Sequence, residues 1–184
     1  MKSIAILSIA GLAAAASAQG ISVDFSASAT EINVGDTVTW TVSVTATGYG
    51  PTAYFGGFVG SFLSSDNTLG LASNMITFMN GEALPPVADG ADVTTINVFN
   101  SALLGTDDQS IGVFYQFDVT ATAEGALSYT AAGTWSQFAD DGIFSLPDEF
   151  TAPPITSDTV NIVPAPGALA LLGLGGLTAT RRRR

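Results

Sequence analysis

A ten-residue stretch of strict alternation is the feature that most constrains the fold. In residues 37–46, apolar side chains at the even positions alternate with Thr or Ser at the odd positions, and the apolar set includes Trp40. Successive side chains of a strand point to opposite faces, so this period of two buries one face and leaves the other in water. A helix would scatter the same apolar residues around its circumference. The stretch predicts a half-buried antiparallel strand.

Similar patterns recur along the chain. The segments that we expect to form strands are 21–28, 32–34, 37–46, 54–63, 74–79, 93–99, 111–122, 127–135, 143–146 and 159–163. Clusters of Gly, Asp, Asn and Pro separate them. One phase of segment 111–122 is expected to face the core, and it comprises Ile111, Val113, Tyr115, Phe117, Val119 and Ala121. Residues 148–158, with two prolines, are expected to form a loop or an edge crossing.

About eight or nine strands joined by short turns predict an all-β fold, a sandwich of two antiparallel sheets. Both an immunoglobulin-like sandwich and a jelly roll match this pattern. We expect one domain, residues 19–162, without internal repeats. It is flanked by an N-terminal signal helix and a short C-terminal membrane helix.

Residues 1–18 have the layout of a secretory signal peptide. Lys2 precedes an apolar run at 4–16, and Ala16-Ser17-Ala18 supplies the small residues that precede a cleavage site. A helix of the length of that run reaches about 20 Å, which is too short for a hydrocarbon core about 30 Å thick. We therefore assign 1–18 to export.

Residues 163–184 carry a second processing signature. A stretch rich in Gly, Leu and Ala at 167–180 would be about 21 Å long as a helix, shorter than a bilayer core. An apolar stretch followed by arginines favours a membrane helix whose basic end stays in the cytoplasm. The short length favours a brief anchor over a lasting one. The flanking residues of the signature are Val163, Pro164, Ala165, Pro166, Arg181, Arg182, Arg183 and Arg184.

The order of Pro-x-Pro, short apolar helix and arginine cluster resembles the PEP-CTERM sorting signal. The resemblance implies export, recognition of the tail by a membrane sorting enzyme called an exosortase, and association with the cell surface or an exopolysaccharide matrix. Ala165 stands where the commonest form of the signal has Glu, so this is a Pro-Ala-Pro variant. An ordinary C-terminal membrane anchor is the alternative.

A second resemblance covers residues 30–46. The stretch Thr30-Glu31-Ile32-Asn33-Val34-Gly35-Asp36-Thr37-Val38 is similar to the early strands of bacterial immunoglobulin-like and cohesin-like domains. The resemblance implies a β-sandwich for the body of the protein.

Charge is segregated along the chain. All five basic residues are Lys2 and 181–184, whereas residues 19–162 hold all 16 acidic residues and no Lys, Arg or His. Nucleic-acid binding requires cations that neutralise phosphate, so it is excluded for this domain. The carboxylates repel one another, so stability should rise with salt or divalent cations.

The missing residue types also exclude most catalytic chemistry. Without His or Lys, the domain cannot build a Ser-His or Ser-Lys pair or form a Schiff base. The chain has no Cys, which excludes disulfides, Fe–S clusters and thiolate metal sites. A glycoside hydrolase needs only two facing carboxylates, so that class stays open. We nevertheless expect no enzyme.

Acidic loops leave one cofactor open, Ca²⁺, which takes about six to eight oxygen ligands. The residues that we expect to bind Ca²⁺ are Asp140, Asp141, Asp148 and Glu149. Solvated turns are the alternative, because Asp commonly decorates turns. Trp135 lies at the end of a predicted strand beside polar residues, where a partly exposed ring would stack on a sugar.

These patterns predict an exported structural or interaction protein without catalytic activity. It would be anchored in the inner membrane during sorting by an exosortase and then reside at the cell surface or in the extracellular matrix. A Ca²⁺-dependent carbohydrate-binding or adhesive module, with exopolysaccharide as its partner, is the first alternative. A carboxylate-based glycoside hydrolase is the second.

Overall fold

The computed structural model describes residues 20–47, 54–79, 81–99, 112–138, 148–150, 152–165 and 167. The predicted signal helix at 1–18 lies outside these ranges, and so does the predicted membrane helix beyond Gly167. Within them, the regular elements are β-strands and one 3-10 helix, η1 (Asn67–Leu69). The strands are β1 (Gly20–Ala27), β2 (Glu31–Asn33), β3 (Thr37–Thr47), β4 (Tyr54–Ser64), β5 (Gly70–Thr77), β6 (Gly81–Leu84), β7 (Val87–Asp89), β8 (Asp92–Phe99), β9 (Gly112–Ala121), β10 (Gly125–Leu127), β11 (Tyr129–Phe138), β12 (Asp148–Phe150), β13 (Ile155–Ser157) and β14 (Val160–Val163).

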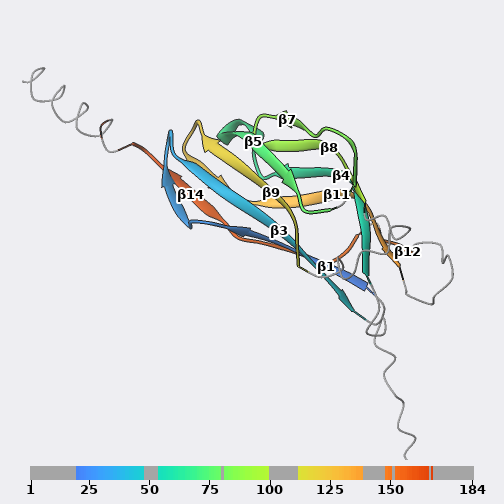
Figure 1. Ribbon diagram of the computed structural model, residues 1–184. Coiled ribbons are helices and arrows are strands. Elements are labelled where there is room, and N and C mark those ends of the chain that lie inside the picture. The colour runs from blue at the N-terminus through green and yellow to red at the C-terminus, as the bar shows by residue number, and fades with distance from the viewer. Residues whose placement is uncertain are drawn as a thin grey trace, which may run out of the picture.

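Two sheets face each other and form a sandwich (Figure 1). Sheet A has the strand order β13-β1-β3-β9-β5, and sheet C has the order β12-β11-β4-β8-β6, with β7 also paired to β8. A third sheet, B, has the order β10-β14-β2, and its strand β14 lies toward the end of the molecule away from β12 (Figure 1). The two-layer all-β architecture confirms the predicted β-sandwich. The prediction that its sheets are antiparallel throughout is wrong, because β13 pairs with β1, and β14 pairs with β2, in parallel.

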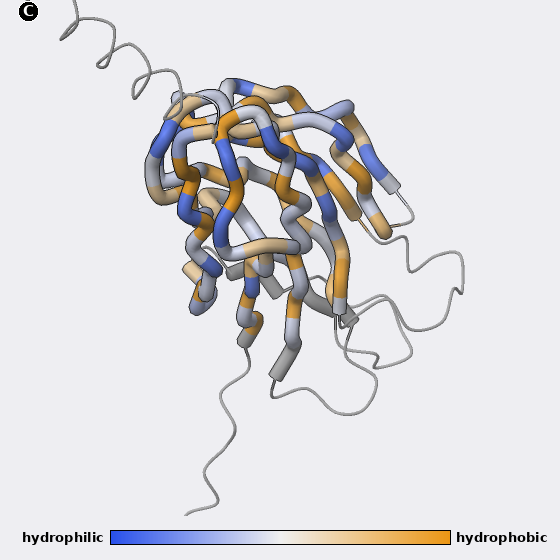
Figure 2. The backbone as a smooth tube through the Cα atoms, turned by 90° about the vertical axis from the view of Figure 1, so that its left-hand side faces the viewer, coloured by the Kyte–Doolittle hydropathy of each residue, from blue (hydrophilic) through white to orange (hydrophobic). Residues whose placement is uncertain are grey.

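The core between the sheets is strongly aromatic. Phe62 lies at its centre, with its ring centroid 5.2–6.2 Å from those of five other rings. Those neighbours are Phe25, Phe58, Phe114, Tyr115 and Phe117. The alternation in β3 holds as predicted, since Val38, Trp40 and Val42 are fully buried. Figure 2 shows the corresponding alternation of hydrophobic and hydrophilic residues along the strands.

The predicted single phase of segment 111–122 is wrong at its start. Val113 is 46% exposed, whereas Phe114 and Tyr115 are both buried. The cause is a register shift, because Val42 pairs with Tyr115 but the next residue, Ser43, pairs with Val113. Phe114 is therefore the extra residue of a β-bulge, which reverses the phase of everything before it. Ile111 lies outside the described residues.

Several predicted strand boundaries also differ from the structure. The predicted strand 127–135 is split at Ser128, because β10 pairs with β14 whereas β11 pairs with β4. Strand β5 begins at Gly70, and the bulge at Asn74, whose φ is 46°, breaks its alternation. The sequence pattern missed the short strands β6 and β7. It also missed β12 and β13, because residues 148–158 were expected to form a loop or an edge crossing, whereas these two strands pair with β11 and β1. The predicted strand at 143–146 lies outside the described residues.

The edge strands of sheets A and C are poor templates for further strand pairing. Strand β5, one edge of sheet A, carries the bulge at Asn74, and its Ala72 amide donates to the carbonyl of Gly90 (2.8 Å). The other edge of sheet A, β13, is three residues long. In sheet C, Pro85-Pro86 separates β6 from β7, and the opposite edge strand, β12, is three residues long. Short, bulged and proline-interrupted edges disfavour strand addition by another chain. A partner is therefore expected to bind through side chains.

Candidate interaction surface

The outer face of sheet C is built from two rows of side-chain positions that cross neighbouring strands. The first row is Thr134 on β11, Val59 on β4, Asn97 on β8 and Leu84 on β6. The second row is Ser136, Gly57, Phe99 and Gly81 on the same strands. We call these two rows the uncharged face.

Three apolar side chains dominate the uncharged face. Val59 is 53% exposed, Leu84 is 54% exposed and Phe99 is 42% exposed. Their exposure follows from the strand period, because Val59 lies between the buried Phe58 and the inward-facing Gly60, and Phe99 follows the buried Val98. Apolar residues thus occupy both the inner and the outer phases of these strands.

Glycines fix the position of the Phe99 ring. A Cβ atom on Gly81 would lie 2.3 Å from Cε2 of Phe99, so the ring packs directly against the β6 backbone. Gly57 has a φ of +153°, and a Cβ there would lie 2.4 Å from the carbonyl oxygen of Val98. Larger residues at either position would displace Phe99. The two glycines therefore keep this part of the face flat.

The uncharged face contrasts with the acidic composition of the domain. Strands β4 and β11 contain no charged residue, and the single acid of β8 is its first residue, Asp92. Asp92 is partly buried, and its Oδ1 accepts hydrogen bonds from the Ser64 backbone N–H (2.7 Å) and from the Ser64 hydroxyl (2.5 Å). The carboxylates of Glu82 and Asp89, in contrast, lie exposed on β6 and β7 at the margin of the sheet.

The outer face of sheet A has a different character. Asp118 projects from β9 and accepts hydrogen bonds from the Thr39 hydroxyl (2.6 Å) and the Asn74 side-chain amide (2.8 Å). Asp24 accepts a bond from the Thr156 hydroxyl (2.5 Å). The polar groups of this face therefore bond to one another across the strands. That arrangement leaves few polar groups for a ligand, although the same face also exposes the apolar side chains of Leu71, Ile76 and Val113.

Local donors also stabilise carboxylates in the turns. The Asn33 side chain and backbone N–H groups lower the pKa of Asp36, and the Thr68 hydroxyl and backbone N–H lower the pKa of Asp66. Burial is the main cause that raises the pKa of Tyr115 and of Tyr129, with smaller contributions from the charges of Glu82 and Asp92.

The predicted Ca²⁺ ligands are not brought together by anything that the structure describes. Asp140 and Asp141 lie outside the described residues. Asp148 and Glu149 belong to β12, where they pair in register with Gln137 and Ser136. No group of three or more His, Cys, Asp or Glu side chains suited to a metal ion occurs within the described ranges. The Ca²⁺ site stays a prediction.

The prediction that Trp135 stacks on a sugar is wrong. Trp135 is fully buried, and its ring lies 4.1 Å from Phe58, 5.7 Å from Phe114 and 6.0 Å from Phe55, measured between centroids. A ring enclosed on both faces cannot stack on a ligand. Ser136, one of the polar neighbours that suggested exposure, lies in the opposite phase of β11, on the outer side of the sheet.

The sorting signature begins where the domain ends. Val163 is the last residue of β14, and its carbonyl accepts a 2.9 Å hydrogen bond from the Val34 amide. Pro164 and Ala165 follow without regular structure, and Pro166 and Arg181 to Arg184 lie outside the described residues. In the part of the chain that is described, no helix has both the length and the apolar character needed to cross a membrane.

The sequence contained one overlooked sign of the uncharged face. In β4, Val59 and Leu63 occupy the phase opposite to Phe58 and Phe62, so both phases of this strand are apolar. A strand of an exposed sheet usually has one polar phase. Leu84 could not be found in this way, because β6 is too short to show a period.

The comparisons with known proteins address the fold. No protein-family model matches the chain, and no curated protein matches it. Among solved structures, the chain is similar to a cohesin module from a Clostridium perfringens family 33 glycoside hydrolase, with a TM-score of 0.56, 11% identity and coverage of 80% of this chain and 100% of that one. The fold is that of a cohesin module.

Two further structures have the same fold. The seventh ScaB type I cohesin from Pseudobacteroides cellulosolvens gives a TM-score of 0.54 at 16% identity, covering 79% of this chain and 94% of that one. The OlpA cohesin of Clostridium thermocellum, solved as a cohesin–dockerin complex, gives 0.53 at 11% identity, covering 77% and 99%. The cohesin-like character expected for the body is thereby confirmed at the level of the fold.

Proposed function

We propose that this domain is a non-catalytic protein-interaction module of an exported protein, and that it binds its partner through the uncharged face. The observation that carries the proposal is the exposure of Val59, Leu84 and Phe99 within two rows of positions that hold no charged residue, in a domain that holds 16 acids. Exposed apolar groups gathered on one face are characteristic of interaction sites. The cohesin–dockerin complex among the similar structures supports a protein partner.

The proposal that the domain has no catalytic activity is supported by the hydrogen bonds that its described carboxylates accept. Asp92, Asp118 and Asp158 accept hydrogen bonds from hydroxyl, amide or backbone donors nearby. A hydrolytic pair needs one carboxyl group with a raised pKa facing a second across a cleft. The described carboxylates with shifted pKa values, Asp36 and Asp66, are shifted downward.

A site-specific cross-linking experiment tests the binding surface. A photo-reactive amino acid replaces Val59 in the full-length chain, expressed in the cells that make the protein. The matched control replaces Val113, an exposed valine (46%) on the outer face of sheet A. We expect cross-links to another protein from position 59 and none from position 113. Equal yields from both positions, or no protein adduct from either, would contradict the proposed surface.

We further propose that residues 163–184 act as an exosortase sorting signal of the PEP-CTERM type. The end of the folded domain supports this boundary, because Pro164 has no N–H and cannot extend the pairing of β14. The chain therefore leaves the sheet at Pro164, the second residue of the proposed signal. Transient anchoring in the membrane followed by transfer to the surface or matrix is the expected path.

Replacing Arg181 to Arg184 by Gln tests the sorting proposal. Loss of the basic stop should release the protein or misplace it, as measured by fractionation into membrane, surface and medium. Replacement of Thr178 and Thr180 by Ala, in the same segment, is the control and should leave localisation unchanged. An unaltered distribution of the arginine variant would count against the signal.

A further inference from the structure

We propose that the partner of the uncharged face is a protein whose contact surface has an apolar centre and a rim of Lys and Arg side chains. This inference rests on the proposed function and adds the chemistry of the partner. It follows from the apolar side chains at the centre of the face, the carboxylates at its margin, and the absence of Lys, Arg and His from residues 19–162.

The centre of the face favours apolar groups. Val59, Leu84 and Phe99 are each about half exposed, and their row neighbours Asn97 and Thr134 are short and uncharged. The backbone donors and acceptors of β4, β8 and β11 are already used in the sheet. A partner therefore gains free energy here by removing apolar surface from water, about 25 cal/mol for each Å².

The margin of the face is acidic. Asp89 ends β7 in the same phase as the exposed Val87. Glu82 pairs with the buried Val98, and a register shift separates it from Leu84, so it lies in the opposite phase, exposed on the edge strand β6. A standard interface covers about 800 Å² on each partner, enough to extend from the apolar centre to this margin.

The domain cannot neutralise these carboxylates itself. Residues 19–162 contain no Lys, Arg or His, so every ion pair at this surface must use a cation from outside the domain. Carboxylates that lose water at an interface without a cationic or hydrogen-bonding partner oppose binding. A partner with Lys and Arg around its apolar patch removes this penalty and is also attracted over a distance.

A second copy of the chain, an anionic lipid surface and a polysaccharide fit the uncharged face less well than a basic protein does. A second copy of this chain would bring 16 more acids and no cation in its domain, so the two margins would repel each other. An anionic lipid surface would be repelled in the same way. A polysaccharide is the weaker alternative, because the two rows hold one aromatic ring, Phe99, on which a sugar could stack.

Zero-length carbodiimide coupling provides a direct test. This reagent joins a carboxylate to a lysine amine in contact with it, and the mature domain has no lysine of its own. Every amide formed with a lysine therefore reports a partner. Cells that export the full-length protein are treated with the reagent, and the adducts are purified and located by mass spectrometry. We expect amides between Glu82 or Asp89 and lysines of one other protein.

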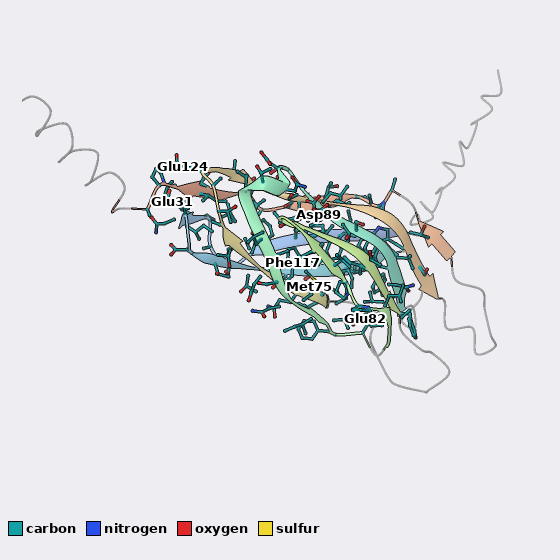
Figure 3. All side chains as sticks on the ribbon, turned by 90° about the horizontal axis from the view of Figure 1, so that it is seen from above. Glu31, Met75, Glu82, Asp89, Phe117 and Glu124 are labelled. Carbon is teal, nitrogen blue, oxygen red and sulfur yellow. The ribbon has the colours of Figure 1, made fainter. Side chains whose placement is uncertain are left out.

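Matched variants test whether formation of these amides depends on binding through the uncharged face. Val59→Asp should reduce the yield of adduct about tenfold or more, the scale of losing one well-placed apolar contact. Val113→Asp, with the same change on sheet A, should not. Glu31 and Glu124 lie toward the other end of the domain from Glu82 (Figure 3), so Glu124→Gln should leave the adducts unchanged. Raising NaCl from about 0.05 M to 0.5 M should lower the yield.

The outcomes separate this inference from the proposed function. A protein that photo-cross-links at position 59 but forms no amide with Glu82 or Asp89, and whose binding is insensitive to salt, would overturn the basic rim and leave the interaction surface intact. No adduct by either chemistry would overturn both. Adducts only between two copies of the chain, only with lipid, or only with polysaccharide would also overturn the inference.

Discussion

Replacement of Trp135 distinguishes a structural ring from a ligand-binding ring. Trp135 is fully buried between Phe55, Phe58 and Phe114, so Trp135→Ala removes a large side chain from the centre of the core. Truncation of a buried Trp or Phe to Ala typically costs about 3–5 kcal/mol. For a domain of this size each kcal/mol lowers the melting temperature by about 3–4 °C, so we expect a fall of about 10–20 °C.

Trp135→Phe should behave quite differently. The indole Nε1 of Trp135 is buried and has no hydrogen-bond partner among the described residues. An unpaired buried donor costs about 1–3 kcal/mol, and Phe removes that cost while keeping one aromatic ring in place. The lost volume opposes the gain, so the net change should stay within about 1.5 kcal/mol.

The assay is thermal and urea-induced unfolding of the purified protein, followed by far-ultraviolet circular dichroism. Thr134→Ala, the adjacent outward-facing residue of β11, is the control and should change the melting temperature by less than about 3 °C. A Trp135→Ala protein as stable as the wild type would refute the burial. A Trp135→Phe protein as unstable as Trp135→Ala would refute the role assigned to the unpaired N–H.

Three further predictions concern stability. Gly133→Ala should lower the free energy of unfolding in urea by about 1–3 kcal/mol, because the added Cβ would lie 2.3 Å from the Val59 carbonyl oxygen. An effect no larger than that of Thr134→Ala would contradict the close approach of β11 and β4. Burial raises the pKa of Tyr129 in the folded state, so the stability that this shift contributes is present below pH 10 and is lost as the pH rises above 10, where the unfolded tyrosine ionises. The urea midpoint should therefore fall more steeply above pH 10 in the wild type than in Tyr129→Phe, and equal slopes would argue against the shift. Salt should raise the melting temperature by screening the carboxylates, and a Ca²⁺ site at Asp140, Asp141, Asp148 and Glu149 should make Ca²⁺ more effective than Mg²⁺ at equal ionic strength; identical effects of the two ions would remove that site.

The fold class was readable from the sequence because its signal is local. The alternation in β3 and the spacing of Gly, Asn, Asp and Pro depend only on residues close in the chain. The same local rule failed at Val113, because the bulge at Phe114 exists only when β9 pairs with β3. It also missed β6 and β7, which are held in place by pairing with β8 and are too short to show a period.

The candidate site was less predictable than the fold. Sequence alone separated the acidic domain from its basic ends, and that composition excluded nucleic-acid binding and most catalysis without any structure. It could not tell that Trp135 faces the core, or that Val59, Leu84 and Phe99 meet on one surface. Residue types and their local period are properties of the chain, whereas exposure depends on which distant strands pair and which sheet covers each face. Tertiary structure alone therefore decided where the uncharged face lies.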